Sequence, residues 1–299
     1  MIMSKPQLTR GVVVGYDGTD ASAAALAWAA RQAALQRTVL RIVHVAPPRA
    51  DPPPGLHPRA AADLAAVRPR PHLVAWRVDR GDPVARLARA AAGARLLVLG
   101  HRDPRPLIGS TLAGVLGHQV SDVAVVPGSW SAREPLRNRI VVGVRDGASR
   151  HALDLACTLA TTAGAALTVV HSTDALATSG DRRTAEQTIR LEAAARGMLE
   201  SLLDSTLRTG CDLDLDVRLV PGDPTGALLR AGRTADLIVV GARLLDGLPG
   251  RRLGSTIERL LGSSDRPVLV ARPVRAGLRG LLARSNPFLR ADRDAVPAS

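Results

Sequence analysis

Lysine is almost absent from this chain of 299 residues, in which Lys5 is the only one. A Walker A loop needs a lysine beside the phosphates, a protein kinase needs one on a strand, and a Schiff-base enzyme needs one as its amine. Because Lys5 precedes the first apolar segment, it cannot serve any of these sites. The sequence therefore excludes these three kinds of chemistry.

Aromatic residues are also scarce, at 2% of the chain, although the net charge is +13. Proteins that grip single-stranded nucleic acid combine basic grooves with aromatic side chains on which bases stack. The basic residues here are nearly all arginine, and alanine is abundant, which is the pattern of a GC-rich coding sequence. We therefore expect no nucleic-acid partner.

Long apolar runs and paired cysteines are missing as well. No apolar run approaches the roughly 20 residues that a membrane-spanning helix needs, and residues 1–10 lack the apolar segment of a signal peptide. Cys157 and Cys211 are far apart and neither belongs to a CxxC motif, so no disulfide framework is needed. We expect a soluble cytoplasmic protein without a membrane span.

The composition is otherwise that of a folded protein, and the chain repeats itself. It is 46% hydrophobic, enough for a sizeable core, and its length predicts about two domains. Each half opens with a short apolar strand that ends in an acidic-Gly turn, at 11–18 and 139–147. Alanine-rich helical stretches and second apolar strands follow, at 21–35 and 39–45 in one half and at 149–163 and 167–172 in the other.

The two copies differ in the middle and converge again toward their ends. Residues 46–71 of the first read as a proline-rich loop, whereas residues 181–208 of the second have apolar residues at helical spacing. Both copies then carry Gly-Asp-Pro, which places a capping Asp and a first-turn Pro at a helix start. Fourth strands, Gly-Ser-Thr helix starts and last strands follow, at 95–100, 109–111 and 123–127 and at 236–241, 254–256 and 267–273.

Five strands alternate with helices in each copy. This pattern predicts an α/β fold of two tandem doubly wound domains, each a five-stranded parallel sheet flanked by helices. We expect the first domain at residues 1–132, the second at 133–273, and a basic, flexible tail at 274–299. Ligands of such sheets bind beyond the carboxyl ends of the strands, where the strand order reverses. The acidic turn after the first strand and the glycine segment after the fourth are expected there.

The segment after the fourth strand of the second copy carries the most specific motif. Gly241 is followed by two residues, Leu244, nine residues and then Gly254-Ser255-Thr256. This spacing resembles the Gly-x2-Gly-x9-Gly-Ser/Thr motif of the universal stress protein family, with Leu244 in place of the middle Gly. The resemblance covers nearly all of both copies. It implies an ATP-binding regulator of the stress response rather than an enzyme.

The resemblance also implies which residues bind nucleotide, and it includes no catalytic or metal-binding residue. In the second copy they are Asp146, Ser172, Gly241, Arg243, Gly254, Ser255 and Thr256. In the first copy they are Asp17, Val45, Gly100, Gly109 and Ser110. Asp146 matches less cleanly than Asp17, because Arg145 shifts the register by one.

Partners follow from the same resemblance. Mg²⁺ can accompany the ATP. The last strands, residues 123–126 and 268–271, are expected to pair the two domains within the chain. The sequence leaves open whether two chains also form a homodimer. A paired last strand has no open edge for aggregation.

The first copy departs further from the motif than the second. Its loop after Gly100 is four residues shorter, and Asp103 stands where the middle Gly is expected. A carboxylate near phosphates is repulsive. In the second copy, glycines let backbone amides approach phosphate oxygens, so we expect ATP mainly there.

Plainer interpretations of the same residues stay open. The acidic residues can be turn or cap residues, the glycines can simply end strands, the Gly-Ser-Thr segment can be an ordinary helix start, and Arg243 can lie on the surface. His44 and His171 recur at the ends of the second strands, which predicts a packing or hydrogen-bonding role inherited with the fold rather than a metal site.

Two other functions compete with the nucleotide-binding regulator. A scaffold for protein interactions follows if both glycine loops are too degenerate to bind nucleotide. An ATP-cleaving enzyme of a related fold is disfavoured. Enzymes of that kind carry a Ser-Gly-Gly-type loop after the first strand. This chain has Asp-Gly-Thr-Asp there, at residues 17–20. Equilibrium binding of ATP separates the regulator from the scaffold.

Overall fold

The computed structural model describes residues 11–49, 51–102, 111–118, 120–173, 185–207, 213–242, 244–245 and 252–273. Elements of the N-terminal half are β1 (Val12–Gly15), α2 (Asp20–Leu35), β2 (Val39–Ala46), α3 (Leu56–Ala65), β3 (Leu73–Arg80), α4 (Pro83–Ala91), β4 (Leu96–His101), α5 (Thr111–His118) and β5 (Val123–Pro127). Those of the C-terminal half are β6 (Arg139–Gly143), the 3-10 turn η1 (Gly147–Ser149), α6 (Arg150–Ala163), β7 (Ala166–Ser172), α7 (Ala185–Leu207), β8 (Leu215–Val220), α8 (Pro224–Gly232), β9 (Leu237–Gly241), β10 (Leu244–Leu245), β11 (Arg252–Leu253), α9 (Ser255–Leu261) and β12 (Val268–Ala271).

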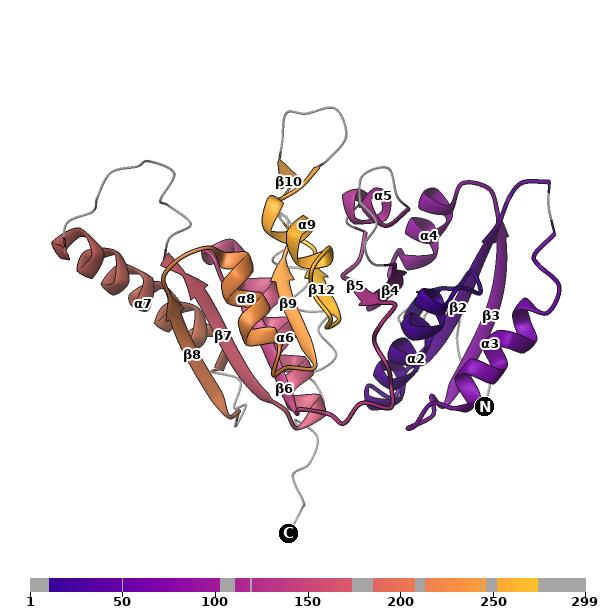
Figure 1. Ribbon diagram of the computed structural model, residues 1–299, viewed down its shortest axis with the longest axis horizontal. Coiled ribbons are helices and arrows are strands. Elements are labelled where there is room, and N and C mark those ends of the chain that lie inside the picture. Colours follow the sequence, from indigo (N-terminus) through magenta and orange to yellow (C-terminus); the bar gives the residue numbers. More distant parts are fainter. Residues whose placement is uncertain are drawn as a thin grey trace, which may run out of the picture.

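Ten strands form one sheet in the order β3-β2-β1-β4-β5-β12-β9-β6-β7-β8 (Figure 1). Strands within each half run parallel, and the two halves meet at an antiparallel pair of β5 with β12. Each half repeats one strand order, which reverses between its first and fourth strands. The predicted α/β fold with helices flanking a parallel sheet is confirmed.

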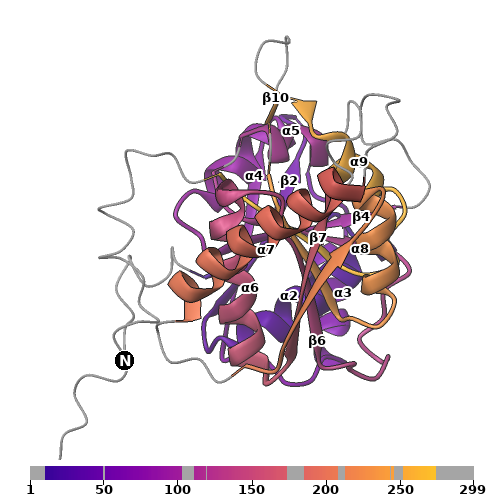
Figure 2. The same cartoon turned by 90° about the vertical axis from the view of Figure 1, so that its left-hand side faces the viewer.

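Helices cover both faces of the sheet, so the inner strands are buried on both sides. One apolar layer joins the strands to α2, α3, α6 and α7, and the other joins them to α4, α5, α8 and α9. Figure 2 shows α6 and α8 on opposite sides of the strands of the C-terminal half. Burial on both faces explains why strands such as Val12–Gly15 are continuously apolar rather than alternating. No helix in the described ranges is long and apolar enough to cross a membrane.

The two Gly-Asp-Pro segments form the helix starts that the sequence predicts. The Asp82 carboxylate accepts a hydrogen bond from the Ala85 amide at 2.7 Å, and Asp223 accepts one from Gly226 at 2.9 Å. Pro83 and Pro224 then occupy first-turn positions, whose missing amide hydrogen has no partner within a helix.

The proline-rich segment 46–71 is not simply a loop, because it contains the helix α3. Pro58 is the third residue of α3, where its missing N–H costs no helical hydrogen bond, and an alanine run follows it. Leu56 and Ala60 are buried in the apolar layer that also contains α2, and the Tyr16 hydroxyl donates to Asp63 on this helix at 2.8 Å. Tertiary contacts thus stabilise a helix that the proline content obscures.

His44 and His171 perform the same structural task in the two halves. His44 Nδ1 lies 2.9 Å from the carbonyl oxygen of Tyr16, and His171 Nδ1 lies 2.9 Å from that of Val144. Each imidazole therefore ties the end of a second strand to the residue that follows the first strand. The predicted hydrogen-bonding role is confirmed, and it holds the chain where each first strand leaves the sheet.

The junction between the halves is apolar on both faces. Val268 lies opposite Val125, and Leu269 lies opposite Ala124. These residues are buried, and each of the two apolar layers contains residues from both halves. The chain is therefore one continuous sheet with two continuous cores.

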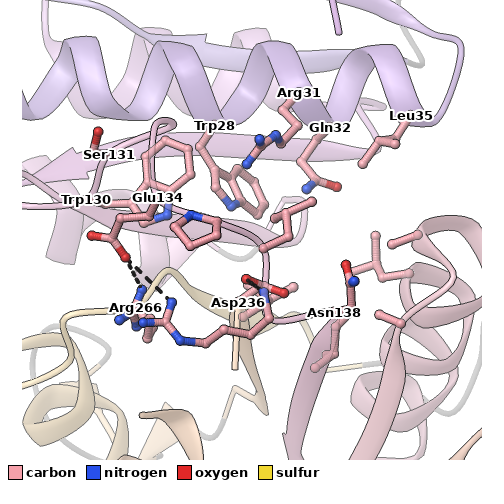
Figure 3. Close-up of a pocket in the computed structure, with 18 residues that line it drawn as sticks. Trp28, Arg31, Gln32, Leu35, Trp130, Ser131, Glu134, Asn138, Asp236 and Arg266 are labelled. Atoms are coloured by element: carbon pink, nitrogen blue, oxygen red, sulfur yellow. Dashed lines mark hydrogen bonds and ion pairs between the residues drawn. The ribbon is translucent and has the colours of Figure 1, made fainter. Parts of the chain in front are cut away.

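Polar contacts also link the two halves at this junction. Asp122, which is buried, has its Oδ1 atom 2.9 Å from His151 Nε2 and 2.9 Å from the Arg272 amide nitrogen. At the linker, Arg266 donates to Glu134 at 2.7 Å (Figure 3). This ion pair borders a cavity of about 100 Å³ that is walled by Trp28 on α2 and by the linker residues around Trp130. A cavity of this size is far smaller than an ordinary ligand pocket.

Replacing Glu134 with Gln should lower stability at pH 7 but not in acid. The hydrogen bond from Arg266 is the main cause of the lowered pKa of Glu134. A carboxylate with a lowered folded-state pKa adds stability above its unfolded pKa of about 4.3, and that stability is lost as pH falls through the folded-state pKa. Because Glu134 is half exposed, we expect at most about 1 kcal/mol in urea unfolding at pH 7, and this difference should be lost as the pH falls through the lowered pKa of Glu134.

Glu186→Gln is the matched control. Glu186 pairs with Arg190 on the exposed surface of α7, so its loss should change stability by no more than about 0.5 kcal/mol at any pH. Equal stability of Glu134→Gln and the parent chain at pH 7 would contradict a stabilising linker ion pair.

Candidate functional site at the carboxyl ends of β6 and β9

The strand order of the C-terminal half reverses between β6 and β9. The chain leaves β6 toward β7 on one side, and β9 continues toward β12 on the other. Connections that depart in opposite directions leave a crevice beyond the carboxyl ends of two such strands. This is the place where the sequence predicts a ligand.

A cavity of about 350 Å³ lies at this crevice. It is lined by residues 143–146, 148 and 149 at and after the end of β6, Val170 and Ser172 on β7, Pro224 and Leu228 on α8, residues 240–242 on and after β9, and residues 254–257 at α9. The volume falls in the usual range for small-molecule sites, roughly 300–1,000 Å³.

Six of the residues that the sequence proposes for the second copy line this one cavity. They are Asp146, Ser172, Gly241, Gly254, Ser255 and Thr256. Arg243 lies outside the described residues, as do Gly109 and Ser110 of the first copy. The backbone of Leu244 forms the short strand β10, which pairs with Leu253 of β11. The segment expected to be a glycine-type loop is therefore partly a two-stranded hairpin.

The Asp146 carboxylate is already engaged within the protein. Its Oδ1 accepts a hydrogen bond from the Ala148 amide at 3.0 Å, which caps the turn η1. Its Oδ2 accepts from the Arg145 guanidinium at 2.7 Å. The Ser149 hydroxyl in turn accepts from the Arg145 amide at 3.0 Å. This network holds Arg145 and Asp146 at the rim of the cavity.

Register corrects the assignment of Asp146 as the counterpart of Asp17. The amides of Tyr16 and Val144 donate to the carbonyls of Val43 and Val170, so Tyr16 and Val144 are equivalent. The residue after Val144 is Arg145. The C-terminal half thus carries a cation, Arg145, at the position of Asp17, and Asp146 follows it as the cap of η1.

The opposite rim of the cavity is held by polar contacts of its own. The Ser172 hydroxyl donates to the Gly222 carbonyl, which ties the end of β7 to the start of α8. Asp223, beside Pro224, accepts two hydrogen bonds from Arg259 on α9, at 3.0 and 2.9 Å. The hydrogen bond from the Gly226 amide is the main cause of the lowered pKa of Asp223. The start of α8 is therefore linked to α9, and both helices contribute residues to the cavity lining.

Comparison with known proteins assigns the chain to a family. The model of the universal stress protein family matches residues 9–127 and again residues 137–272. The chain belongs to the universal stress protein family. A universal stress protein of Mycobacterium tuberculosis is 28% identical, over 90% of this chain and 97% of the relative. One of Mycolicibacterium smegmatis is 29% identical, over 88% of this chain and 97% of the relative.

Solved structures agree on the fold. The crystal structure of a universal stress protein from Archaeoglobus fulgidus aligns with a TM-score of 0.66 at 18% identity, over 89% of this chain and 99% of that one. A putative universal stress protein from Pseudomonas aeruginosa aligns with a TM-score of 0.59 at 20% identity, over 90% and 95% of the two chains. At such identity the likeness concerns the fold alone.

The N-terminal universal stress protein repeat uses its matching residues differently. Asp17 accepts from the Thr19 amide at 3.0 Å and from its hydroxyl at 2.7 Å, which positions Thr19 as the cap of α2. Burial raises the pKa of Asp17, but these hydrogen bonds outweigh it and lower the pKa overall. Val45 lies on β2 and packs against the apolar layer of α4 and α5.

Gly100 and Gly241 lie at or next to the ends of equivalent strands, in very different surroundings. A Cβ atom on Gly100 would lie 2.2 Å from the carbonyl oxygen of Ala21, so the first turn of α2 packs directly on this glycine. A Cβ atom on Gly241 would meet nothing closer than 3.9 Å. Packing alone therefore requires a glycine at position 100, whereas position 241 has room.

Sequence reasoning missed the apolar part of the C-terminal cavity and one charged residue. Val170, Leu228 and Val240 form apolar walls, and Arg145 lies at the rim. The apolar residues gave no signal because they resemble other core positions. Arg145 could have been found by aligning the two halves strictly on their first strands. Among the described residues, no group of three or more His, Cys, Asp or Glu side chains is placed to hold a metal ion.

Alanine at the two strand-end glycines should have opposite consequences. We expect Gly100→Ala to destabilise the protein by about 1–3 kcal/mol, because the new methyl group overlaps backbone atoms of α2. Gly241→Ala should change stability by less than about 0.5 kcal/mol. Urea unfolding of both variants measures this, and a similar loss in the two would show that the packing difference does not exist.

Proposed function

We propose that this universal stress protein is an adenine-nucleotide-binding regulator of the stress response that works in the cytoplasm and binds ATP in its C-terminal half. The observation that carries the proposal is the cavity at the strand reversal of β6 and β9. It combines six residues that the sequence resemblance assigns to nucleotide with a volume suited to a small molecule.

The lining of the cavity is divided as a nucleotide requires. Val170, Leu228 and Val240 supply apolar surface suited to the base. Gly254, Ser255 and Thr256, at the start of α9, supply backbone amides and hydroxyls for phosphate oxygens. Mg²⁺ bound with ATP would neutralise part of the phosphate charge.

The ionisable groups at this cavity support a binding role rather than a catalytic one. Among the described lining residues, Arg145 and Asp146 are the ones that carry charge, and they pair with each other. A general base must reach the proton that it removes, and its pKa must suit that task. A carboxylate that caps a turn and pairs with arginine is better suited to holding a ligand.

We further propose that the two repeats act as one permanently joined pair of universal stress protein domains, spanning residues 1–132 and 133–273. The antiparallel register of β5 with β12 and the shared apolar layers support this proposal. A chain that carries both domains does not need a second copy to bury these two strands.

Gly254→Asp should weaken ATP binding at least tenfold. The new carboxylate would enter the cavity beside the amides of Ser255 and Thr256 and repel the phosphates. Isothermal titration of the full-length protein with ATP and Mg²⁺ measures the loss. Mass spectrometry of the freshly purified protein should find ATP from the host, with its occupancy counted.

Gly197→Asp is the control for this variant. Gly197 lies on α7 and has open space around it, so the same change in charge is made away from the cavity. ATP binding should be unchanged there. Absence of ATP binding in the parent chain would overturn the proposal in favour of an interaction scaffold, and release of ADP or AMP at catalytic rates would favour an enzyme.

A further inference from the structure

The sheet order fixes where each part of a bound nucleotide would lie. In the C-terminal half, β6 lies between β9 and β7. The phosphate-side residues follow β9, and the apolar walls are Val170 on β7, Leu228 on α8 and Val240 on β9. A nucleotide whose base lies against Val170 and Leu228 and whose phosphates lie at Gly254–Thr256 places its ribose over the carboxyl end of β6. The residues at that end are Arg145 and Asp146.

The main chain of Arg145 is fixed in position, whereas its side chain is held only by an exposed ion pair. Its amide donates to the Ser149 hydroxyl at 3.0 Å, which fixes the main chain. Its guanidinium pairs with Asp146 at 2.7 Å, and the two side chains are 50% and 43% exposed. Ion pairs as exposed as this contribute little to stability, so the guanidinium can exchange partners readily.

The charge at this position is reversed between the two halves of the chain. Asp17 occupies it in the N-terminal half and Arg145 in the C-terminal half, as the register of the equivalent hydrogen bonds shows. In dinucleotide-binding sheets, an acidic residue in the ribose region selects free ribose hydroxyls, and an arginine selects a phosphate esterified to one of them. A guanidinium also fits a phosphate with two parallel hydrogen bonds.

We infer that the C-terminal cavity prefers adenine nucleotides that carry a second phosphate on the ribose, and that Arg145 recognises this phosphate. The inference rests on the proposed nucleotide-binding function. When Arg145 turns to the phosphate, Asp146 keeps its hydrogen bond from the Ala148 amide. The oxygen that Arg145 releases on Asp146 accepts a hydrogen bond from the remaining free ribose hydroxyl.

The test compares ligands that differ by one phosphate. Isothermal titration of the full-length protein uses AMP, adenosine 2′,5′-bisphosphate, adenosine 3′,5′-bisphosphate and ATP. At least one bisphosphate should bind about tenfold or more tightly than AMP, a difference of about 1.4 kcal/mol. Which of the two binds better identifies the hydroxyl that carries the phosphate.

Three variants connect the preference to Arg145. Arg145→Ala should bring the bisphosphate and AMP within about twofold of each other, since a single charge-assisted contact accounts for the preference. Arg145→Lys should keep part of the preference. Arg150→Ala is the control. The Arg150 side chain donates to the Ser205 hydroxyl and does not line the cavity, so its removal should leave the preference for the bisphosphate unchanged.

The outcomes separate this inference from the proposed function. If ATP binds but neither bisphosphate binds more tightly than AMP, the ribose-phosphate preference is wrong and nucleotide binding stands. If Arg145→Ala keeps the preference, the assignment to Arg145 is wrong. If none of the four ligands binds, both the inference and the proposed function fail. Circular dichroism of each variant checks that a lost preference is not lost folding.

Discussion

The main-chain pairing of β5 with β12 is the contact on which the rest of this structure depends. Without it, each half would end in an apolar strand whose backbone groups lack partners, a recognised route to aggregation. With it, Val125 faces Val268 and Ala124 faces Leu269 in a single sheet, and both apolar layers run across the junction. The two halves therefore share their cores rather than merely touching.

The same pairing brings the N-terminal half to the edge of the C-terminal cavity. Leu253 on β11 is buried in one apolar layer with Leu112 and Val115 on α5. Gly254, the next residue, lines the cavity. Helix α5 of the N-terminal repeat thus packs against the segment of the C-terminal repeat that contributes Gly254 to the cavity. This arrangement gives the N-terminal repeat a structural role at the site even though its own glycine loop departs from the family motif.

Matched positions in the two halves have partly different tasks. The histidines His44 and His171 share one, because each holds the end of a first strand. Gly100 is a packing glycine beneath α2, whereas Gly241 lies beside open space. Asp17 supports a helix cap, whereas Arg145 faces a cavity. Equivalent positions in one sheet are therefore free to diverge wherever the packing that surrounds them differs.

Local patterns determined most of the fold from the sequence alone. Continuous apolar strands, the caps at Asp82 and Asp223, and six lining residues of the cavity could be placed because each depends on neighbours along the chain or on strand ends. Only the tertiary structure decided the helix α3, the tight contact at Gly100, the hairpin of β10 with β11 and the place of Arg145. These features depend on contacts between atoms that are distant in sequence. Whether Arg145 or Asp146 matches Asp17 depends on a shift of one residue in the alignment of the two halves. Periodicity and composition do not detect a shift of one residue, whereas the hydrogen bonds between strands show it directly.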